Sequence, residues 1–271
     1  MQLSPWLAIQ RGALLLKNVN AAIRLLSAGR HVHDLIRRRP TLILNFATKP
    51  FITRRWDAKT RTDVFINHCR TVARIGGLLD FPEHRSVELL RLSKIEGSYR
   101  IALGQSWWLQ MEGLMTFGLY EDDDRFFHLS CCLGTASDGE LIAYIGGIQG
   151  VSKPRALEQH RVFTKRSFGM RPRDFLVEAF RLFCLSLGVQ RIYAVPRSNH
   201  VNALTVECLP DYDRLWIERG GQFKDGFFLL SPNPTRRRIE DIPKNKRSMY
   251  RRRFDFLDDV GREFCRKAVN S

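Results

Sequence analysis

The feature of this sequence that most constrains its fold is a change of hydrophobic period near residue 95. Before that point, apolar residues recur every three or four positions, as between Leu14 and Leu26, which is typical of amphipathic helices. From residue 99 to 148, apolar and polar residues alternate, which is typical of half-buried strands. Beyond residue 150, helical and strand-like segments take turns. This order predicts an α+β fold, with a helical N-terminal part followed by a mixed β-sheet flanked by helices.

The same patterns predict a helical region over residues 1–95 and a mixed-sheet region over residues 96–271, which ends in a helix. Gly, Pro and Asp residues mark most of the expected ends of elements. Helices are predicted over residues 14–26, 60–75, 82–92, 154–162, 172–187, 211–219 and 246–268. Strands are predicted over residues 99–103, 107–120, 126–133, 141–148, 190–196 and 227–230.

The chain is strongly basic. Lys and Arg number 44 against 28 Asp and Glu, so the formal net charge is +16. Such a charge favours anionic partners, among them tRNA, an acidic carrier protein and an anionic membrane surface. Hydrophobic residues make up 44% of the chain, which is enough to bury a sizeable core. No run of about 18 apolar residues occurs, so no transmembrane segment is predicted.

The six cysteines have neither the spacing of a disulfide framework nor that of a metal site. We interpret them as reduced thiols, which predicts a cytoplasmic protein without a metal cofactor. The helix expected over residues 14–26 can either pack on the main domain or lie on a membrane surface, so association with a membrane stays open.

A basic segment over residues 161–173 leads into the helix predicted over residues 172–187. It holds five Lys or Arg residues and no carboxylate. The free N–H groups and the dipole at a helix start favour an anion, so this segment is a candidate phosphate site, with a solvated loop as the alternative. The candidate contacts are Arg161, Lys165, Gly169 and Arg171.

Two adjacent glycines, Gly146 and Gly147, lie near the end of the strand predicted over residues 141–148. Glycine there permits a β-bulge or the close approach of a ligand or another backbone. Both are therefore candidate contacts for an acyl donor, and the alternative is an ordinary strand end.

Acyl transfer to an amine or hydroxyl needs a base for the acceptor and an acid for the leaving group. The candidates are Glu112, His128, His160 and Tyr212. Glu112 stands among apolar residues in an expected strand, where burial raises a carboxyl pKa; the alternative is a salt bridge to an arginine. The histidines and Tyr212 have ordinary strand, surface or packing roles as alternatives. His200 follows a strand in a polar loop, but no GxSxG motif supports a Ser–His hydrolase.

A second basic stretch, over residues 236–253, contains nine Lys or Arg residues and few aromatic ones. That composition favours attraction to the phosphates of a nucleic-acid backbone or a lipid headgroup over base stacking. A solvated helix face is the alternative.

Four segments in register carry a family resemblance. They cover residues 145–150 (IGGIQG), 164–172, 212–221 and 246–253. Their order and spacing, from about residue 60 to the end, resemble the VirK/YbjX proteins of bacteria. Glu112-Gly113 also fits, with Met111 where that family usually has Arg. The resemblance implies a cytoplasmic bacterial protein, and some relatives are associated with virulence and with tolerance of cationic antimicrobial peptides. It implies no catalytic residue.

The predicted order of elements beyond residue 96 is also similar to that of GNAT-type acyltransferases. By this analogy, residues 141–147 form the strand that contacts the acyl donor, the helix over residues 172–187 faces its phosphates, and Tyr212 lies on a tyrosine-bearing helix. The loop departs from the GNAT pattern, because Gly169 is followed by Met-Arg-Pro rather than by small residues. An acylated carrier protein or an aminoacyl-tRNA therefore suits the site better than coenzyme A.

These features predict an acyl- or aminoacyl-transferase. It would move an acyl group from a carrier protein, CoA or aminoacyl-tRNA to an amine or hydroxyl of a peptide, protein or envelope component. The alternative is a non-enzymatic virulence or envelope-stress factor that binds anionic lipid or nucleic acid, and a chaperone-like partner protein is a third hypothesis.

Overall fold

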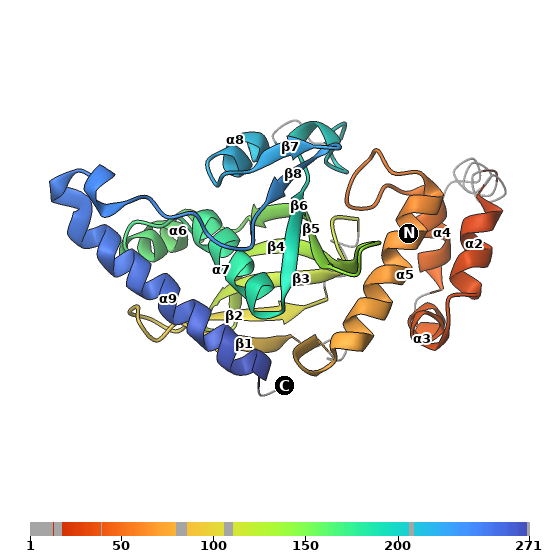
Figure 1. Cartoon of the computed structure of the whole chain (residues 1–271), viewed down its shortest axis with the longest axis horizontal. Helices are drawn as coiled ribbons and strands as arrows, with labels where there is room; N and C mark the ends of the chain where they lie inside the picture. Colours follow the sequence, from red (N-terminus) through yellow and green to blue (C-terminus); the bar gives the residue numbers. More distant parts are fainter. Residues whose placement is uncertain are drawn as a thin grey trace.

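The computed structural model describes Ala13 and residues 18–38, 40–79, 86–105, 111–205 and 209–269. The predicted order of helices, then strands, then alternating elements is confirmed (Figure 1). The helices are α2 (Val19–Leu26), α3 (Arg30–Arg38), α4 (Thr41–Thr48), α5 (Ala58–Ile75), α6 (Ala156–Arg166), α7 (Pro172–Ser186), α8 (Tyr212–Ile217) and α9 (Arg247–Val269). The strands are β1 (Val87–Arg91), β2 (Tyr99–Gly104), β3 (Met115–Glu121), β4 (Asp124–Thr135), β5 (Leu141–Gly150), β6 (Val189–Ala194), β7 (Gln222–Lys224) and β8 (Phe227–Leu230).

Two expectations about elements are wrong, and one strand was not predicted. The helix predicted over residues 82–92 is contradicted by β1, because antiparallel pairing with β2 overrides the helical spacing of its leucines. The strand predicted from residue 107 begins only at Met115; residues 107–110 lie outside the described part, as do Leu14–Lys17 of the first predicted helix. The three-residue strand β7 was not predicted, because all its side chains are exposed and give no burial pattern.

The eight strands form one mixed sheet in the order β1-β2-β3-β4-β5-β6-β8-β7. Strands β1 to β5 form an antiparallel meander, and β6 then pairs in parallel with β5 through the α6–α7 connection. Helix α7 lies over the sheet, α9 packs along α7, and the N-terminal helices stand beside α5 at the other end of the molecule (Figure 1). This order of strands and helices is the one on which the GNAT analogy depends.

The core has two parts that meet across the sheet. The larger one lies between the sheet, α7 and α9, and the smaller one joins α2–α5 to the sheet. The adjacent Cys131 and Cys132 show the division, because Cys131 belongs to the larger core and Cys132 to the smaller one. The cysteines that the structure describes are free thiols, and Cys208 lies outside the described residues. None of the described helices is long and apolar enough to cross a membrane.

A short segment before α5 joins two loops that are distant in sequence. Ile52 is fully buried, has a φ of 60°, and donates its N–H to the Met111 carbonyl at 2.6 Å. Thr53 forms a β-bridge with His200, and the Arg54 N–H donates to the Asn199 carbonyl at 2.9 Å. A β-branched residue in the left-handed region is strained, so packing and these bonds must hold it there. The segment thereby fixes the loops before β3 and after β6 relative to each other.

Candidate functional site

The sheet opens where β6 ends. β5 and β6 pair in parallel up to Ile145 and Ala194, and the Val195 N–H donates to the Ile145 carbonyl at 2.9 Å. β5 then continues to Gly150, whereas the chain leaves β6 for a polar loop. Openings at the carboxyl ends of neighbouring parallel strands are common ligand sites in α/β sheets.

The two predicted glycines lie at this opening. Ser130 pairs with Gly147 and Cys131 pairs with Ile145, so Gly146 is the extra residue of a β-bulge. A Cβ atom on Gly146 would lie 1.9 Å from the Glu112 carbonyl oxygen, and one on Gly147 would lie 2.3 Å from Glu112 Oε2. Glycine is therefore needed here because the loop carrying Glu112 comes so close.

Glu112 lies in the turn before β3, not within a strand as predicted, and only 5% of it is exposed. Its carboxylate accepts three long hydrogen bonds: from Asn202 Nδ2 at 3.3 Å, Ser130 Oγ at 3.4 Å and Gln149 Nε2 at 3.5 Å. Within the described part of the chain no Lys or Arg pairs with it, so the salt-bridge alternative does not hold there. Burial raises the pKa of Glu112 to about 7.

His200 completes an acid–histidine pair with Glu112. Its Nε2 lies 3.5 Å from Glu112 Oε1, and 1% of the residue is exposed. The Asn202 N–H donates to Nδ1 at 3.1 Å, so the neutral ring carries its proton on Nε2, facing the carboxylate. Burial lowers the pKa of His200 to about 4, which keeps the ring neutral near pH 7. His200 was not among the predicted acid–base residues; its place in a polar loop after a strand was the only signal.

Tyr212 fills the opening between β5 and β6. Its hydroxyl donates to the Ile148 carbonyl at 3.3 Å and accepts from the Ile148 N–H at 3.4 Å. The ring stacks on His200 at 5.2 Å and on Trp216 at 6.1 Å, and burial raises the pKa of its phenol. The opening between β5 and β6 is thus occupied by this side chain.

The other two predicted acid–base residues form no hydrogen bond with Glu112 or His200 in the described structure, although His128 lies opposite Gln149, which bonds to Glu112. His128 pairs with Gln149 across β4 and β5, is 5% exposed, and has no hydrogen-bond partner for either ring nitrogen in the described structure. Burial lowers the pKa of His128 to about 4. His160 lies on α6, packs against Phe127 at 5.4 Å, and has a pKa that burial lowers. Only Glu112 and Tyr212 share one cluster with His200.

The predicted basic segment lines a large pocket of about 1060 Å³ at the start of α7. Apolar side chains supply much of its wall, namely Phe127, Phe168, Pro172 and Met249. Five cations surround it, and no carboxylate is among its lining residues. The cations are Arg161, Lys165, Arg171, Arg173 and Arg252. Such a pocket suits a ligand with both a phosphate and an apolar chain.

Most of these cations lack an internal partner. Lys165, Arg171 and Arg252 are exposed and have no ion pair in the part of the chain that the structure describes. Arg161 lies 3.5 Å from the exposed Glu158, and Arg173 lies 3.5 Å from Asp174. Three cations are therefore free to bind an anion.

The loop between α6 and α7 is shaped by two residues in the left-handed region, Phe168 (φ 56°) and Gly169 (φ 75°). Arg253 of α9 donates to the Phe168 carbonyl from Nε at 3.2 Å and from Nη2 at 2.8 Å, which holds the loop in place. Pro172 opens α7 and removes one N–H donor, as predicted from its position.

The pocket and the Glu112 cluster are separate places. A Cβ on Gly147 would meet Glu112 and His200, whereas one on Gly150 would meet His160 and Phe127. Residues an odd number apart on a strand face opposite sides of a sheet, so the two sites lie on opposite faces of β5. From the sequence, Gly146, Gly147 and the basic segment were predicted to form one donor site. In the structure, the two glycines contact Glu112, on the face of β5 opposite to the pocket.

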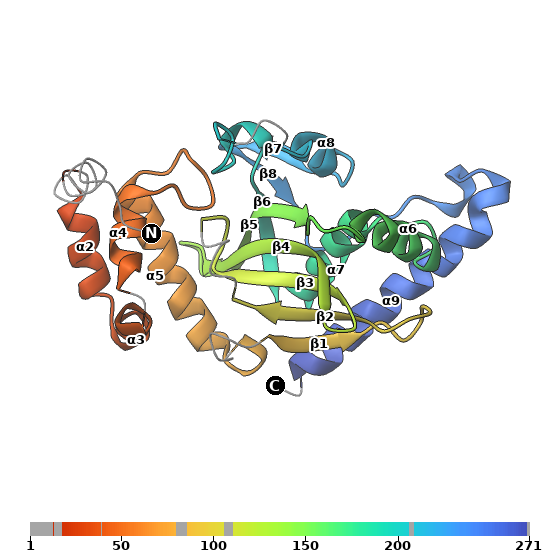
Figure 2. The ribbon, with the colours of Figure 1, turned by 180° about the vertical axis from the view of Figure 1, so that it is seen from behind.

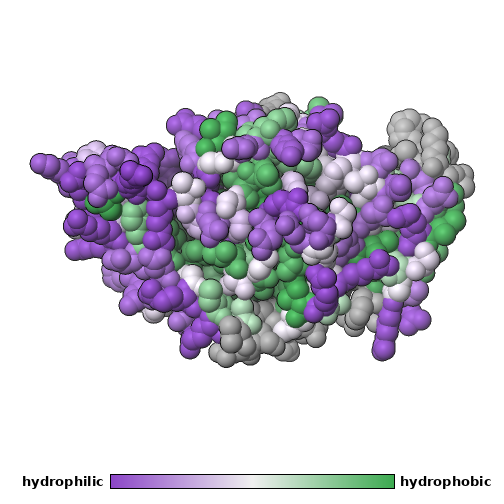
Figure 3. Space-filling model, in the orientation of Figure 1, coloured by the Kyte–Doolittle hydropathy of each residue, from purple (hydrophilic) through white to green (hydrophobic). Residues whose placement is uncertain are grey.

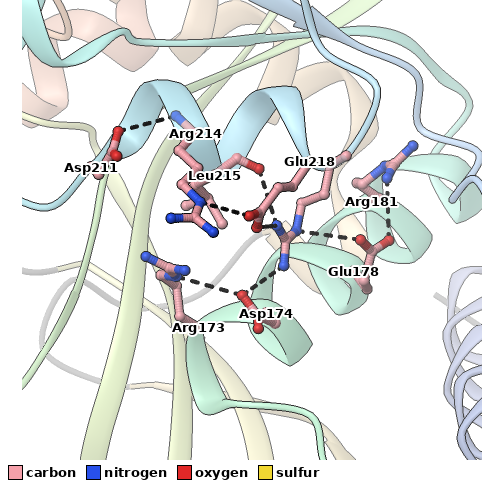
Figure 4. Close-up of polar contacts among 9 residues, drawn as sticks. Arg173, Asp174, Glu178, Arg181, Asp211, Arg214, Leu215 and Glu218 are labelled. Atoms are coloured by element: carbon pink, nitrogen blue, oxygen red, sulfur yellow. Dashed lines mark hydrogen bonds and ion pairs between the residues drawn. The ribbon is translucent and has the colours of Figure 1, made fainter.

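A charge network beside the pocket joins α7 to α8 (Figure 4). Arg219 lies 2.6 Å from Asp174 and 3.5 Å from Glu178, and Arg181 lies 3.2 Å from Glu178. Arg181 also donates to the Ser231 and Asn233 carbonyls at 2.8 and 2.6 Å. In this network every arginine has an acceptor, which is the pattern of structural charges.

The fold and the site define an α+β protein with an opened mixed sheet, a buried acid–histidine pair and a basic pocket with apolar walls. The chain belongs to the family described as "Protein of unknown function (DUF535)", whose model matches residues 8–266. This match confirms the VirK/YbjX resemblance and extends it toward the N-terminus.

Curated relatives support the family assignment. An uncharacterized protein of Haemophilus influenzae is 27% identical over 176 residues, covering 64% of this chain and 59% of the relative. A further Haemophilus influenzae match is 31% identical over 118 residues, covering 43% of this chain and 40% of the relative. The "Uncharacterized protein YbjX" of Escherichia coli is 24% identical over 245 residues, covering 85% and 73%. The chain thus spans about half the length of the two Haemophilus relatives.

Proposed function

We propose that this protein is an acyl- or aminoacyl-transferase whose donor binds in the pocket at the start of α7. The observation that carries the proposal is the combination of apolar walls with three unpaired cations, Lys165, Arg171 and Arg252, at the mouth of that pocket. A thioester or ester donor has the matching chemistry, because it joins a phosphate-bearing carrier to a less polar acyl group.

The Glu112–His200 pair supplies the acid–base chemistry in this proposal. A carboxyl pKa near 7 allows Glu112 to accept a proton at neutral pH. Long hydrogen bonds from Asn202, Ser130 and Gln149 hold the carboxylate in place, and His200 Nε2 lies beside it at 3.5 Å without forming a hydrogen bond in the described structure. With a thioester donor, the acceptor amine attacks the carbonyl carbon; the C–N bond forms as the C–S bond breaks. Glu112 takes the amine proton, and the departing thiolate receives a proton from solvent.

Tyr212 sets a condition on this mechanism. Its ring lies between β5 and β6, so the acyl carbonyl can reach Glu112 only when Tyr212 moves out of the opening. The ring is held by two long hydrogen bonds and by stacking, contacts that a bound donor can replace.

The test is to incubate the pure protein with acyl carrier protein, acyl-CoA and aminoacyl-tRNA in turn, each with a panel of amines and peptides. Mass spectrometry follows consumption of the donor and formation of an acylated acceptor. We expect turnover with one donor class, and Glu112→Gln to lower its rate by about 10²-fold while donor affinity is kept. Glu88→Gln, at a half-buried position on β1, serves as the matched control. No consumption of any donor would contradict a transferase.

The second candidate is a non-enzymatic protein that binds an anionic lipid in the same pocket. The closed opening at Tyr212 favours it, because the pocket then has no access to Glu112. Vesicles with anionic headgroups would bind in a salt-dependent manner through Lys165 and Arg171, without acyl transfer.

A further inference from the structure

We propose that the donor is carried by an acidic carrier protein that docks on the surface around α6 and the start of α9. This inference rests on the proposed function and names its donor. Figure 2 shows α6 and the N-terminal part of α9 at the same end of the molecule. Figure 3 shows that the end where α9 begins is mostly hydrophilic.

The pocket-lining side of α6 continues outward to an exposed leucine. Leu157 is 84% exposed and lies three and four residues before His160 and Arg161, which line the pocket. Thr164 and Lys165 follow one turn later on the same side. An isolated surface leucine needs no explanation, but one beside the mouth of an apolar pocket is a suitable anchor for a protein partner.

Unpaired cations lie on and next to the segments that line the pocket. They come from α6, from the residues just before α9 and from the first turns of α9, on either side of the lining residues Asn245 and Ser248. Each is exposed and has no ion pair in the described residues. They are Lys165, Lys244, Lys246, Arg251 and Arg252. With Leu157 they form what we call the α6–α9 face.

This combination favours a protein over a nucleic acid. A base-stacking surface needs exposed aromatic rings, but the nearby Tyr250 and Phe254 are half-buried, and Arg253 covers Tyr250 at 4.3 Å. An acidic protein surface with an apolar contact matches the charges and Leu157 together. A phosphopantetheine arm from such a partner would place its phosphate among the rim cations and its acyl chain along the apolar wall of the pocket.

The experiment separates the docking face from the pocket. Two probes are titrated by fluorescence anisotropy: a bacterial acyl carrier protein bearing a long-chain acyl phosphopantetheine, and the free acyl phosphopantetheine of the same chain length. Lys244→Glu with Arg251→Glu, and separately Leu157→Ser, change only the face. We expect each to weaken carrier binding by about tenfold and to change binding of the free arm by less than about twofold.

Controls distinguish failure of this inference from failure of the proposed function. Arg171→Ala with Lys165→Ala should weaken both probes, and Lys59→Glu with Lys224→Glu, on α5 and β7, should weaken neither. Carrier binding that is unaffected by both face variants overturns the docking inference even if the free arm binds and acyl transfer occurs. If tRNA displaces the carrier, and tRNA binds the Leu157→Ser variant as tightly as the wild type, the face binds RNA. That result would also overturn the docking inference. If neither probe binds, the docking inference fails; the proposed function itself fails only if no donor class is consumed in the transfer assay as well.

Discussion

Two groups of charges flank the start of α7, and they are organised in opposite ways. In the α7–α8 network, Arg219 and Arg181 each contact carboxylates or carbonyls at hydrogen-bond distance. Figure 4 shows Arg181 beside Glu178. Around the pocket, Lys165 and Arg171 have no internal partner in the described structure. The contrast teaches that arginine content alone does not identify a binding site. Whether nearby carboxylates already pair with the arginines determines whether those arginines can bind a ligand.

Arg173 connects the two groups. It lines the pocket and lies 3.5 Å from Asp174, which Arg219 also contacts. Asp174 is the acidic residue in the first turn of α7, where the helix dipole stabilises it. Asp174 is thus the carboxylate at the boundary between the paired arginines of the α7–α8 network and the unpaired cations of the pocket.

The largest effect on stability is expected from a substitution in the α7–α8 network. Arg219 is nearly buried, and its loss leaves Asp174 and Glu178 without their shared cation. We expect Arg219→Ala to lower the free energy of unfolding by about 3 kcal/mol, measured by urea denaturation. Arg219→Lys should recover only part of it, because an ammonium group cannot match two carboxylates in the same way. A loss below about 0.5 kcal/mol would erase the distinction between the two groups.

The second prediction compares the buried carboxylates. Glu178 has two arginine partners, whereas Glu112 has none in the described residues. The pKa of Glu112 is raised from 4.5 to about 7, so between these pH values the folded state keeps a proton that the unfolded state releases. Wild-type stability should therefore fall as pH rises through this window.

Glu112→Gln removes that dependence. We expect the variant to match the wild type near pH 4.5 and to exceed it above pH 7 by up to about 3 kcal/mol, since one pKa unit is worth about 1.4 kcal/mol. Urea denaturation at several pH values measures the difference. The loss of stability at acidic pH caused by His200, whose pKa is lowered, is common to both proteins and cancels. Parallel stability profiles for the two proteins would contradict the raised pKa.

The smallest effect is expected at the pocket rim. Lys165→Ala with Arg171→Ala should change the free energy of unfolding by less than about 0.5 kcal/mol, because exposed side chains without partners contribute little. Inorganic pyrophosphate should raise the melting temperature of the wild type and not that of the variant. Equal stabilisation of both proteins would show that the rim cations are not the anion site.

The fold was largely predictable because its signals are local. The helical spacing in α5 and α7 and the alternation in β4 each follow from burial of one side of the element. β1 was misassigned because its residues become a strand only by pairing with β2, which no local pattern encodes.

The site was predictable only in its parts. The cations near Pro172 and the acid at Glu112 were found from residue type and context. Their separation on opposite faces of β5 follows from where the loop of Glu112 and helix α6 pack against Gly147 and Gly150, and these are tertiary contacts that no local pattern encodes. The partnership of Glu112 with His200 joins loops 88 residues apart (200 − 112), so it required the tertiary structure.

The strained segment at Ile52 has a consequence for how the molecule can be divided. Its hydrogen bonds hold the loops that carry Glu112 and His200, although the segment itself belongs to the helical N-terminal region. A fragment that begins at residue 96 would keep every strand from β2 to β8 but lose this bracket. The helical region is therefore a structural support of the acid–histidine pair, and removing it would alter the geometry of that pair through the lost backbone bonds to Met111 and Asn199.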